Sequence, residues 1–208
     1  GEAGFDEIQF DYIRFAVDRT MNDVVFDDGD TQGRNKTQAI TEFISYAHDE
    51  LAKEGLFVSA DVFGAIMRSE EDAAAVGQEY EDMAEHLDYI CPMIYPSHYG
   101  PGNFGIEYPD TQPYDTILNA LNGSRELLAA SAKDDTPQAV VRPWLQDFTA
   151  SYLEHYIKYG DEQVRQQIQA VYDAGYDQWI LWDAGVSYHY GGLLTPEEAA
   201  KEDERIAR

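Results

Sequence analysis

The segment Gly4–Phe15, GFDEIQFDYIRF, places the strongest limit on how this chain can fold. With a period of two, apolar and polar side chains fall on opposite faces, namely Ile8, Phe10 and Tyr12 against Glu7, Gln9 and Asp11. A solvent-exposed edge strand would show the same alternation, but it would rarely be so aromatic and β-branched. The pattern favours a strand whose apolar face packs on helices and whose polar face lines an interior.

Four further strand-like segments follow, with helical segments between them. The expected strands are Leu56–Gly64, Tyr89–Tyr95, Ala139–Phe148 and Gln178–Asp183. The expected helices are Thr37–Glu54, Glu70–His86, Tyr114–Ala132, Tyr152–Tyr159, Glu162–Ala174 and a last one that opens with a capping box at Thr195. Regular alternation of strands and helices indicates βα units around a parallel sheet.

Two architectures share this alternation, a doubly wound sheet and a β/α barrel. The sequence has no GxGxxG or GxxxxGK[ST] turn, which a doubly wound sheet would more often show. Inward polar residues such as Asp61, Arg142 and Gln146 favour the barrel. Five strands cannot close an eight-stranded barrel. We therefore expect an α/β fold, a partial (β/α)8 TIM barrel of strands 4–8 whose N-terminal strands are absent.

An internal similarity supports an incomplete barrel. Glu2-Ala3-Gly4-Phe5-Asp6 matches Asp173-Ala174-Gly175-Tyr176-Asp177, and the second copy follows an expected helix. The first copy should follow a helix as well, which would lie upstream. We expect residues 1–208 to form one truncated barrel domain, whose open sheet edge is covered by an upstream segment or by self-association.

The charge balance limits the partners. Forty acidic residues against fourteen basic ones give a net charge of −26, which argues against nucleic-acid and anionic-membrane partners. No apolar run reaches a membrane-spanning length, so no membrane insertion is expected. Such an acidic surface suits either a salty habitat or a secreted enzyme. We expect an extracellular or cell-envelope location.

Metal and cofactor sites are not expected. Cys91 is the only cysteine, which excludes an internal disulfide and a Cys-based metal site, and its apolar neighbours indicate a buried thiol. The acidic segment Asp27–Gly33 could hold calcium, but its spacing does not fit the twelve-residue calcium loop. A substrate-facing loop or a solvated turn explains it better.

Five segments resemble the putative glycosyl hydrolase domain family, TIM-barrel proteins allied to the α-amylase-like and chitinase-like hydrolases. They are Gly4–Phe15, VSADVFG at Val58–Gly64, Asp88–Ile106, WLQDF at Trp144–Phe148 and WILWDA at Trp179–Ala184. They occur in order and span nearly the whole chain. Ala16 stands where the family pattern has Pro. The resemblance implies a carbohydrate substrate and hydrolysis of glycosidic bonds, without a cofactor.

Glycoside hydrolysis needs one carboxyl group that protonates the leaving oxygen and a second that acts as nucleophile or base. Asp11 and Asp61 end consecutive strands with inward side chains. Because parallel strands lie about 4.8 Å apart, these carboxyl groups could lie within the roughly 5–5.5 Å of a retaining pair. Our hypothesis assigns Asp11 as nucleophile or stabilising carboxylate, and Asp61 as acid/base with a raised pKa. The alternative for Asp61 is a structural partner of Arg142.

Other residues near the strand ends would bind the substrate. Aromatic rings stack on sugars, and polar groups hydrogen-bond to hydroxyls. The predicted substrate-binding residues are Tyr12, Arg14, Phe63, Tyr95, His98, Tyr99, Arg142, Trp144, Gln146, Trp182 and Asp183. Two alternatives to an enzyme stay open, a carbohydrate-binding barrel without catalysis and a non-catalytic fragment that needs an upstream segment or a partner.

Overall fold

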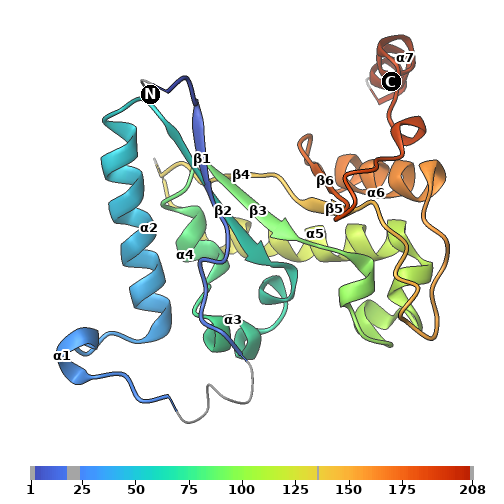
Figure 1. The fold of residues 1–208 in the computed structure, drawn as a ribbon. Helices are drawn as coiled ribbons and strands as arrows, with labels where there is room; N and C mark the ends of the chain where they lie inside the picture. Colours follow the sequence, from blue (N-terminus) through green and yellow to red (C-terminus); the bar gives the residue numbers. More distant parts are fainter. Residues whose placement is uncertain (1–2, 18–23, 135, 207–208) are drawn as a thin grey trace.

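A curled parallel sheet forms the centre of the chain in a computed structural model, which describes residues 3–17, 24–134 and 136–206 (Figure 1). Its strands are β1 (Glu7–Phe10), β2 (Phe57–Phe63), β3 (Tyr89–Met93), β4 (Val140–Val141), β5 (Trp144–Gln146) and β6 (Ile180–Trp182). The strand order is β1-β2-β3-β5-β6, with β4 also paired to β3. This α/β half-barrel of five strand positions confirms the expected partial TIM barrel.

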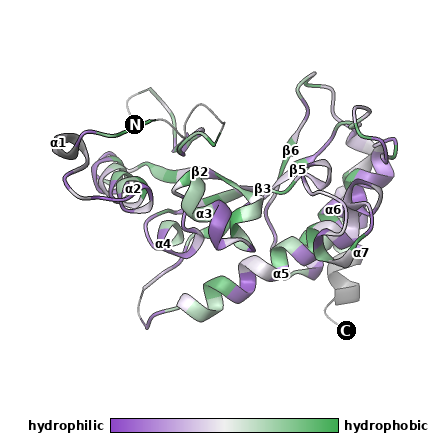
Figure 2. Cartoon of the chain, turned by 90° about the horizontal axis from the view of Figure 1, so that it is seen from below, coloured by the Kyte–Doolittle hydropathy of each residue, from purple (hydrophilic) through white to green (hydrophobic). Residues whose placement is uncertain are grey.

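Most of the helices connect the strands and cover the outer side of the sheet, as Figure 2 shows. They are α1 (Asp28–Thr31), α2 (Lys36–Ala52), α3 (Glu70–Val76), α4 (Tyr80–Ala84), α5 (Pro113–Ser131), α6 (Asp161–Asp173) and α7 (Pro196–Ile206). The expected capping box of α7 is present, because the Glu198 carboxylate accepts a hydrogen bond from the Thr195 backbone and Glu198 N–H donates to the Thr195 hydroxyl.

The alternation of side chains along β2 separates the core from the interior. Val58, Ala60 and Val62 are fully buried in the hydrophobic core, together with helix residues such as Ile44 of α2 and Ile117 of α5. The intervening side chains point to the concave side of the sheet. Burial of aliphatic groups against helices fixes this register, since a shift by one residue would exchange the two faces.

The pairing of β1 with β2 places the two expected catalytic residues at the same height along the neighbouring strands. Phe10 pairs with Ala60, so that Asp11 and Asp61 come next on neighbouring strands. Both strands run parallel, and their carboxyl ends therefore meet at the same rim of the half-barrel. At that rim, β1 ends earlier than the expected Gly4–Phe15 strand, because Tyr12 adopts a left-handed backbone with φ of 55°.

The expected helix Glu70–His86 is two helices, α3 and α4. Gly77 between them has φ of +74°, which ends α3, and a Cβ there would lie 2.9 Å from Lys36 at the start of α2. The following residue, Gln78, is fully buried; it accepts a hydrogen bond from Phe63 N–H and donates to the carbonyl oxygens of Asp61 and Ile13. The break thus places an amide that holds the end of β2.

Two further expectations about local structure are wrong. The strand expected over Ala139–Phe148 is interrupted between β4 and β5, where Pro143 has no N–H to donate. The chain stays between β3 and β6 there, since Arg142 N–H donates to Ile90 C=O of β3 and Pro143 C=O accepts from Ile180 N–H of β6. No helix forms over Tyr152–Tyr159, because backbone N–H groups of that segment bond to side chains instead.

Among the described residues, β1 and β6 each pair with one neighbour and so form the two edges of the sheet. None of the helices in the described ranges has the length and apolar character needed to cross a membrane.

Candidate active site

A cleft of about 260 Å³ opens at the carboxyl ends of the strands. It is lined by Asp11, Tyr12, Arg14, Asp61, Phe63, Met93, Tyr95, His98, Trp144 and Trp182. Both residues predicted as catalytic and seven of those predicted to bind substrate therefore lie around one cleft. Met93, at the end of β3, is the lining residue that the sequence analysis did not name.

Asp61 is the most enclosed carboxylate of the cleft, with a residue exposure of 6%. Its Oδ1 accepts two hydrogen bonds, from Gln9 Nε2 at 2.6 Å and from Trp144 Nε1 at 2.7 Å. Burial is the largest influence on its pKa and raises it; the two hydrogen bonds oppose burial, and the nearby Asp11 charge adds to the rise. A carboxyl group that keeps its proton to higher pH is suited to general acid catalysis.

Asp11 lies at the open side of the same cleft and is exposed. Its Oδ1 accepts a hydrogen bond from the backbone N–H of Tyr12 at 2.7 Å, which fixes the carboxylate beside the left-handed turn. The Arg14 guanidinium lies 4.5 Å from the centre of the Phe63 ring and 5.5 Å from that of Tyr12. The turn after β1 therefore brings a carboxylate and a stacked cation to the rim of the cleft.

Beneath this rim, an ion pair joins the first and fourth strand positions across the half-barrel. Arg142 donates to both carboxylate oxygens of Glu7, and Ser59 Oγ donates to Glu7 Oε1 at 2.6 Å. Burial raises the pKa of Glu7, but the hydrogen bonds from Arg142 and Ser59 outweigh it, and the net pKa is lowered. The Arg142 guanidinium also lies 4.3 Å from the centre of the Tyr89 ring.

This ion pair corrects one alternative from the sequence. The partner of Arg142 is Glu7, whereas Asp61 bonds to Gln9 and Trp144. The sequence analysis placed Glu7 and Gln9 on the polar face of the first strand, but it assigned no role to either. The sequence signal that could have identified Glu7 and Gln9 is their spacing of two residues, which places them on the same face of the strand as Asp11.

The walls of the cleft are aromatic. Trp144 and Trp182 meet edge to face with ring centres 5.9 Å apart, and Tyr95 meets His98 edge to face at 5.0 Å. Burial, followed by the charges of Asp61 and Asp11, raises the pKa of Tyr95, so its hydroxyl stays protonated. Trp182 keeps 43% of its surface exposed. Such rings provide flat apolar faces that are open to a ligand.

The remaining predicted binding residues lie outside the cleft. Arg142 lies beneath it, as described above. Gln146 is fully buried; it accepts from Ser97 N–H and donates to Asp110 and to the Phe148 carbonyl, which makes it an anchor for loops. The Tyr99 hydroxyl is buried, and its ring packs on Phe104 at 4.9 Å.

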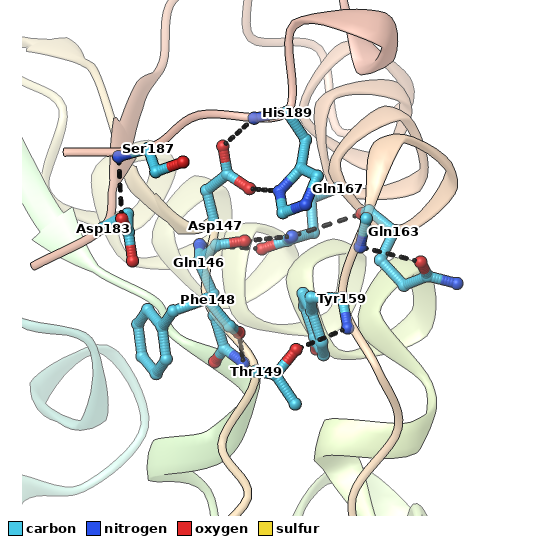
Figure 3. Close-up of polar contacts among 11 residues, drawn as sticks. Gln146, Asp147, Phe148, Thr149, Tyr159, Gln163, Gln167, Asp183, Ser187 and His189 are labelled. Atoms are coloured by element: carbon cyan, nitrogen blue, oxygen red, sulfur yellow. Dashed lines mark hydrogen bonds and ion pairs between the residues drawn. The ribbon is translucent and has the colours of Figure 1, made fainter. Parts of the chain in front are cut away.

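Asp183 accepts a hydrogen bond from Ser187 N–H at 2.9 Å and thereby shapes the loop after β6 (Figure 3). In the same view, the buried Asp147 points toward His189, which lies farther along that loop. It accepts from the His189 backbone N–H at 2.9 Å, and its Oδ1 lies 2.6 Å from His189 Nδ1. Asp147 therefore holds the part of the loop that carries His189. Sequence alone gave no signal that His189 is its partner.

A larger hollow, of about 1020 Å³, lies at the opposite, amino-terminal ends of the strands. Its walls come mainly from β4, α6 and the segments before β6 and α7, and include Val141, Tyr172, Trp179 and Leu193. It contains no pair of carboxylates, so the smaller cleft is the better candidate for catalysis. Within the described ranges, no three His, Cys, Asp or Glu side chains group in a way that could hold a metal ion.

The fold and the cleft define a β/α half-barrel with two carboxylates and aromatic walls at the carboxyl ends of its strands. The chain belongs to the family described as "Putative glycosyl hydrolase domain", whose sequence profile matches residues 1–188. It is thus a glycoside hydrolase-like domain. No curated protein matches this chain.

Two solved structures share the fold at low sequence identity. The spore cortex-lytic enzyme SleL of Bacillus cereus aligns with a TM-score of 0.55 and 11% identity over 91% of this chain and 48% of that one. SleL of Bacillus megaterium QM B1551 gives a TM-score of 0.53 with the same identity and coverage. The PgaB (BpsB) glycoside hydrolase domain from Bordetella bronchiseptica aligns with a TM-score of 0.49 and 11% identity over 85% of this chain and 43% of that one. The chain spans about half the length of these structures.

Proposed function

We propose that this domain hydrolyses glycosidic bonds of an oligosaccharide or polysaccharide. Asp61 serves as the acid/base, and Asp11 serves as the nucleophile or as the carboxylate that stabilises the developing positive charge on the sugar. The observation that carries the proposal is the cleft itself, where an enclosed carboxyl group of raised pKa and an exposed carboxylate share one rim. Family membership supports the same reaction class.

The chemistry follows from the different surroundings of the two groups. Asp61 Oδ1 is occupied by two donors, while Oδ2 accepts no hydrogen bond from the described residues, which leaves it to face a glycosidic oxygen. Proton transfer from this oxygen assists departure of the leaving sugar. Asp11, on the neighbouring strand end, would face the anomeric carbon. The aromatic walls would stack on the sugar rings on either side.

The test is a panel of chito-, laminari-, cello- and malto-oligosaccharides with detection of new reducing ends, run on the full chain. We expect Asp11→Asn and Asp61→Asn each to abolish turnover, because each removes one of two groups that the reaction requires. Asp49→Asn is the matched control, since this aspartate lies on α2 and its side chain is 74% exposed. Full turnover by either cleft variant would refute the assignment.

A second outcome of the panel would favour a different function. Saturable binding of an oligosaccharide without release of reducing ends would identify a carbohydrate-binding barrel that lacks catalysis. The aromatic walls support this alternative, because they would bind a sugar without help from the carboxylates.

Two wider proposals accompany the reaction. The acidic surface and a polysaccharide substrate fit an extracellular or cell-envelope location, which fractionation of the source cells would test. We also propose that an upstream barrel segment or a second copy of the chain covers the edges of the half-barrel at β1 and β6. Size-exclusion chromatography tests the second copy, and a monomer would exclude it.

A further inference from the structure

A second cavity, of about 280 Å³, adjoins the cleft on the same side of the half-barrel. It lies between the loop that follows β3 and the loop that follows β5, and Tyr108, Glu154 and His155 are among its lining residues. His98 lines this cavity and the cleft alike. The two hollows therefore share one wall, the His98 side chain.

The second cavity contains a stacked aromatic pair. The rings of Tyr108 and His155 have centres 3.8 Å apart and planes inclined by 33°. His155 is exposed, and Tyr108 is partly exposed. Tyr108 covers one face of the His155 ring, and His155 as a whole remains exposed beside the cavity. We call Tyr108 and His155 the aromatic platform.

Buried contacts hold the two loops in place. The Asp110 carboxylate, only 2% exposed, accepts from Gln146 Nε2 at 2.9 Å and from Ile157 N–H at 3.3 Å. The Tyr159 hydroxyl donates to the Asp110 carbonyl at 3.0 Å. These bonds tie the loop after β3 to the loop after β5. Because the two loops that carry Tyr108 and His155 are joined before binding, a ligand would lose little affinity to the ordering of these loops.

Polar groups beside the platform suit the hydroxyls of a sugar. Partial desolvation lowers the pKa of His98, which favours the neutral imidazole, although the residue is exposed to solvent. A neutral imidazole offers one donor and one acceptor. Glu154 adds an exposed carboxylate that can accept from hydroxyl groups. A neutral, polyhydroxylated ligand with a flat apolar face fits this set better than an anion.

We propose that this cavity is a further sugar-binding subsite, in which the aromatic platform stacks on a sugar unit beyond the one held in the cleft. The substrate would then be a chain of several sugar units that extends past His98, rather than a disaccharide. The inference rests on the proposed function only in taking a carbohydrate as ligand, and it does not require that the domain cleave that ligand.

The test measures binding apart from turnover. Full-length protein is run by affinity electrophoresis through gels that contain glycol chitin, laminarin, hydroxyethyl cellulose or soluble starch. We expect at least one polymer to retard the wild-type protein, and His155→Ala to weaken that interaction roughly three- to tenfold, the value of one aromatic contact. Tyr46→Ala is the matched control, because this tyrosine lies on α2 and is 65% exposed.

Chain length provides a second measurement. With the oligosaccharide series of the retarding polymer, His155→Ala should weaken binding of the hexasaccharide and leave binding of the disaccharide unchanged. Tyr108→Ala should reproduce this result, and its circular dichroism and thermal melt show whether the domain has stayed folded.

The outcomes separate the two proposals. Polymer binding that depends on His155 without any hydrolysis would support the subsite and overturn the hydrolase. Hydrolysis with equal polymer binding by wild type and His155→Ala would overturn the subsite and leave the hydrolase in place. A wild-type protein that no polymer retards would also overturn the subsite.

Discussion

The hydrogen bond from Trp144 to Asp61 gives the sharpest test of the acid assignment. In Trp144→Phe, the ring stays aromatic, but the Nε1–H that lies 2.7 Å from Asp61 Oδ1 is removed. This donor stabilises the ionised carboxylate, in opposition to the burial that raises the pKa of Asp61. When this donor is lost, less stabilisation of the ionised carboxylate counteracts the effect of burial. The pKa of Asp61 should therefore rise further.

The magnitude follows from the type of bond. A hydrogen bond to a charged group contributes about 1.5–3 kcal/mol. The second donor, Gln9, remains at 2.6 Å and can partly compensate, so the lower end of this range applies. At about 1.4 kcal/mol for each factor of ten, the acid dissociation constant of Asp61 should fall about tenfold. If Asp61 is the general acid, the alkaline limb of the pH–rate profile should move up by about one pH unit.

The assay is a carbon-13 NMR titration of the aspartate side-chain carboxyl groups, in which the signal of Asp61 is assigned by its loss in Asp61→Asn. This measurement needs no substrate. Trp182→Phe is the control, since it removes an indole of the same cleft that is not bonded to Asp61. An Asp61 titration that is unchanged in Trp144→Phe, or that moves to lower pH, would refute the electrostatic reasoning.

Three further variants test the framework around the cleft. Arg142→Met leaves Glu7 without its ion-pair partner; we expect a loss of about 2 kcal/mol in urea unfolding at pH 7, below the usual range for fully buried pairs because both side chains keep some exposure. Because the pKa of Glu7 is lowered on folding, the contribution is present above its unfolded pKa, near 4.5, and should disappear as pH falls below that value. Gly77→Ala should lower thermal stability more than Gly55→Ala, since both glycines have positive φ but only the first would meet a neighbour within 4 Å; equal losses would contradict the packing argument. His189→Ala removes the ring partner of a buried aspartate and should cost about 1–3 kcal/mol with faster proteolysis of the loop after β6; unchanged cleavage would show that the pairing does not hold the loop.

The sequence predicted the alternation of strands and helices because this alternation depends on the local periodicity of apolar side chains. The aliphatic positions of β2, at Val58, Ala60 and Val62, repeat every second residue, and burial against helices is the physical consequence. The same parity predicted that Asp11 and Asp61 would come to one rim. Their catalytic roles stay predictions until the variants are measured.

Errors arose where tertiary contacts override local preference. The segment Tyr152–Tyr159 has a helical sequence pattern, but its backbone donors bond to the side chains of Asp110 and Thr149. Gly77 interrupts an expected helix because the chain must turn there past the start of α2. Asp110 and the start of α2 lie far from these segments in the sequence, so periodicity carried no information about the contacts with them.

By itself, the sequence determined the βα alternation, the direction of each strand's apolar face and the acidic character of the surface. These properties follow from side-chain spacing and charge, which are local. Tertiary structure alone decided that Glu7, rather than Asp61, pairs with Arg142, and that the loops after β3 and β5 meet to form a second cavity. Such pairings join residues far apart in the chain, and they depend on the curvature of the sheet, which sequence spacing does not encode.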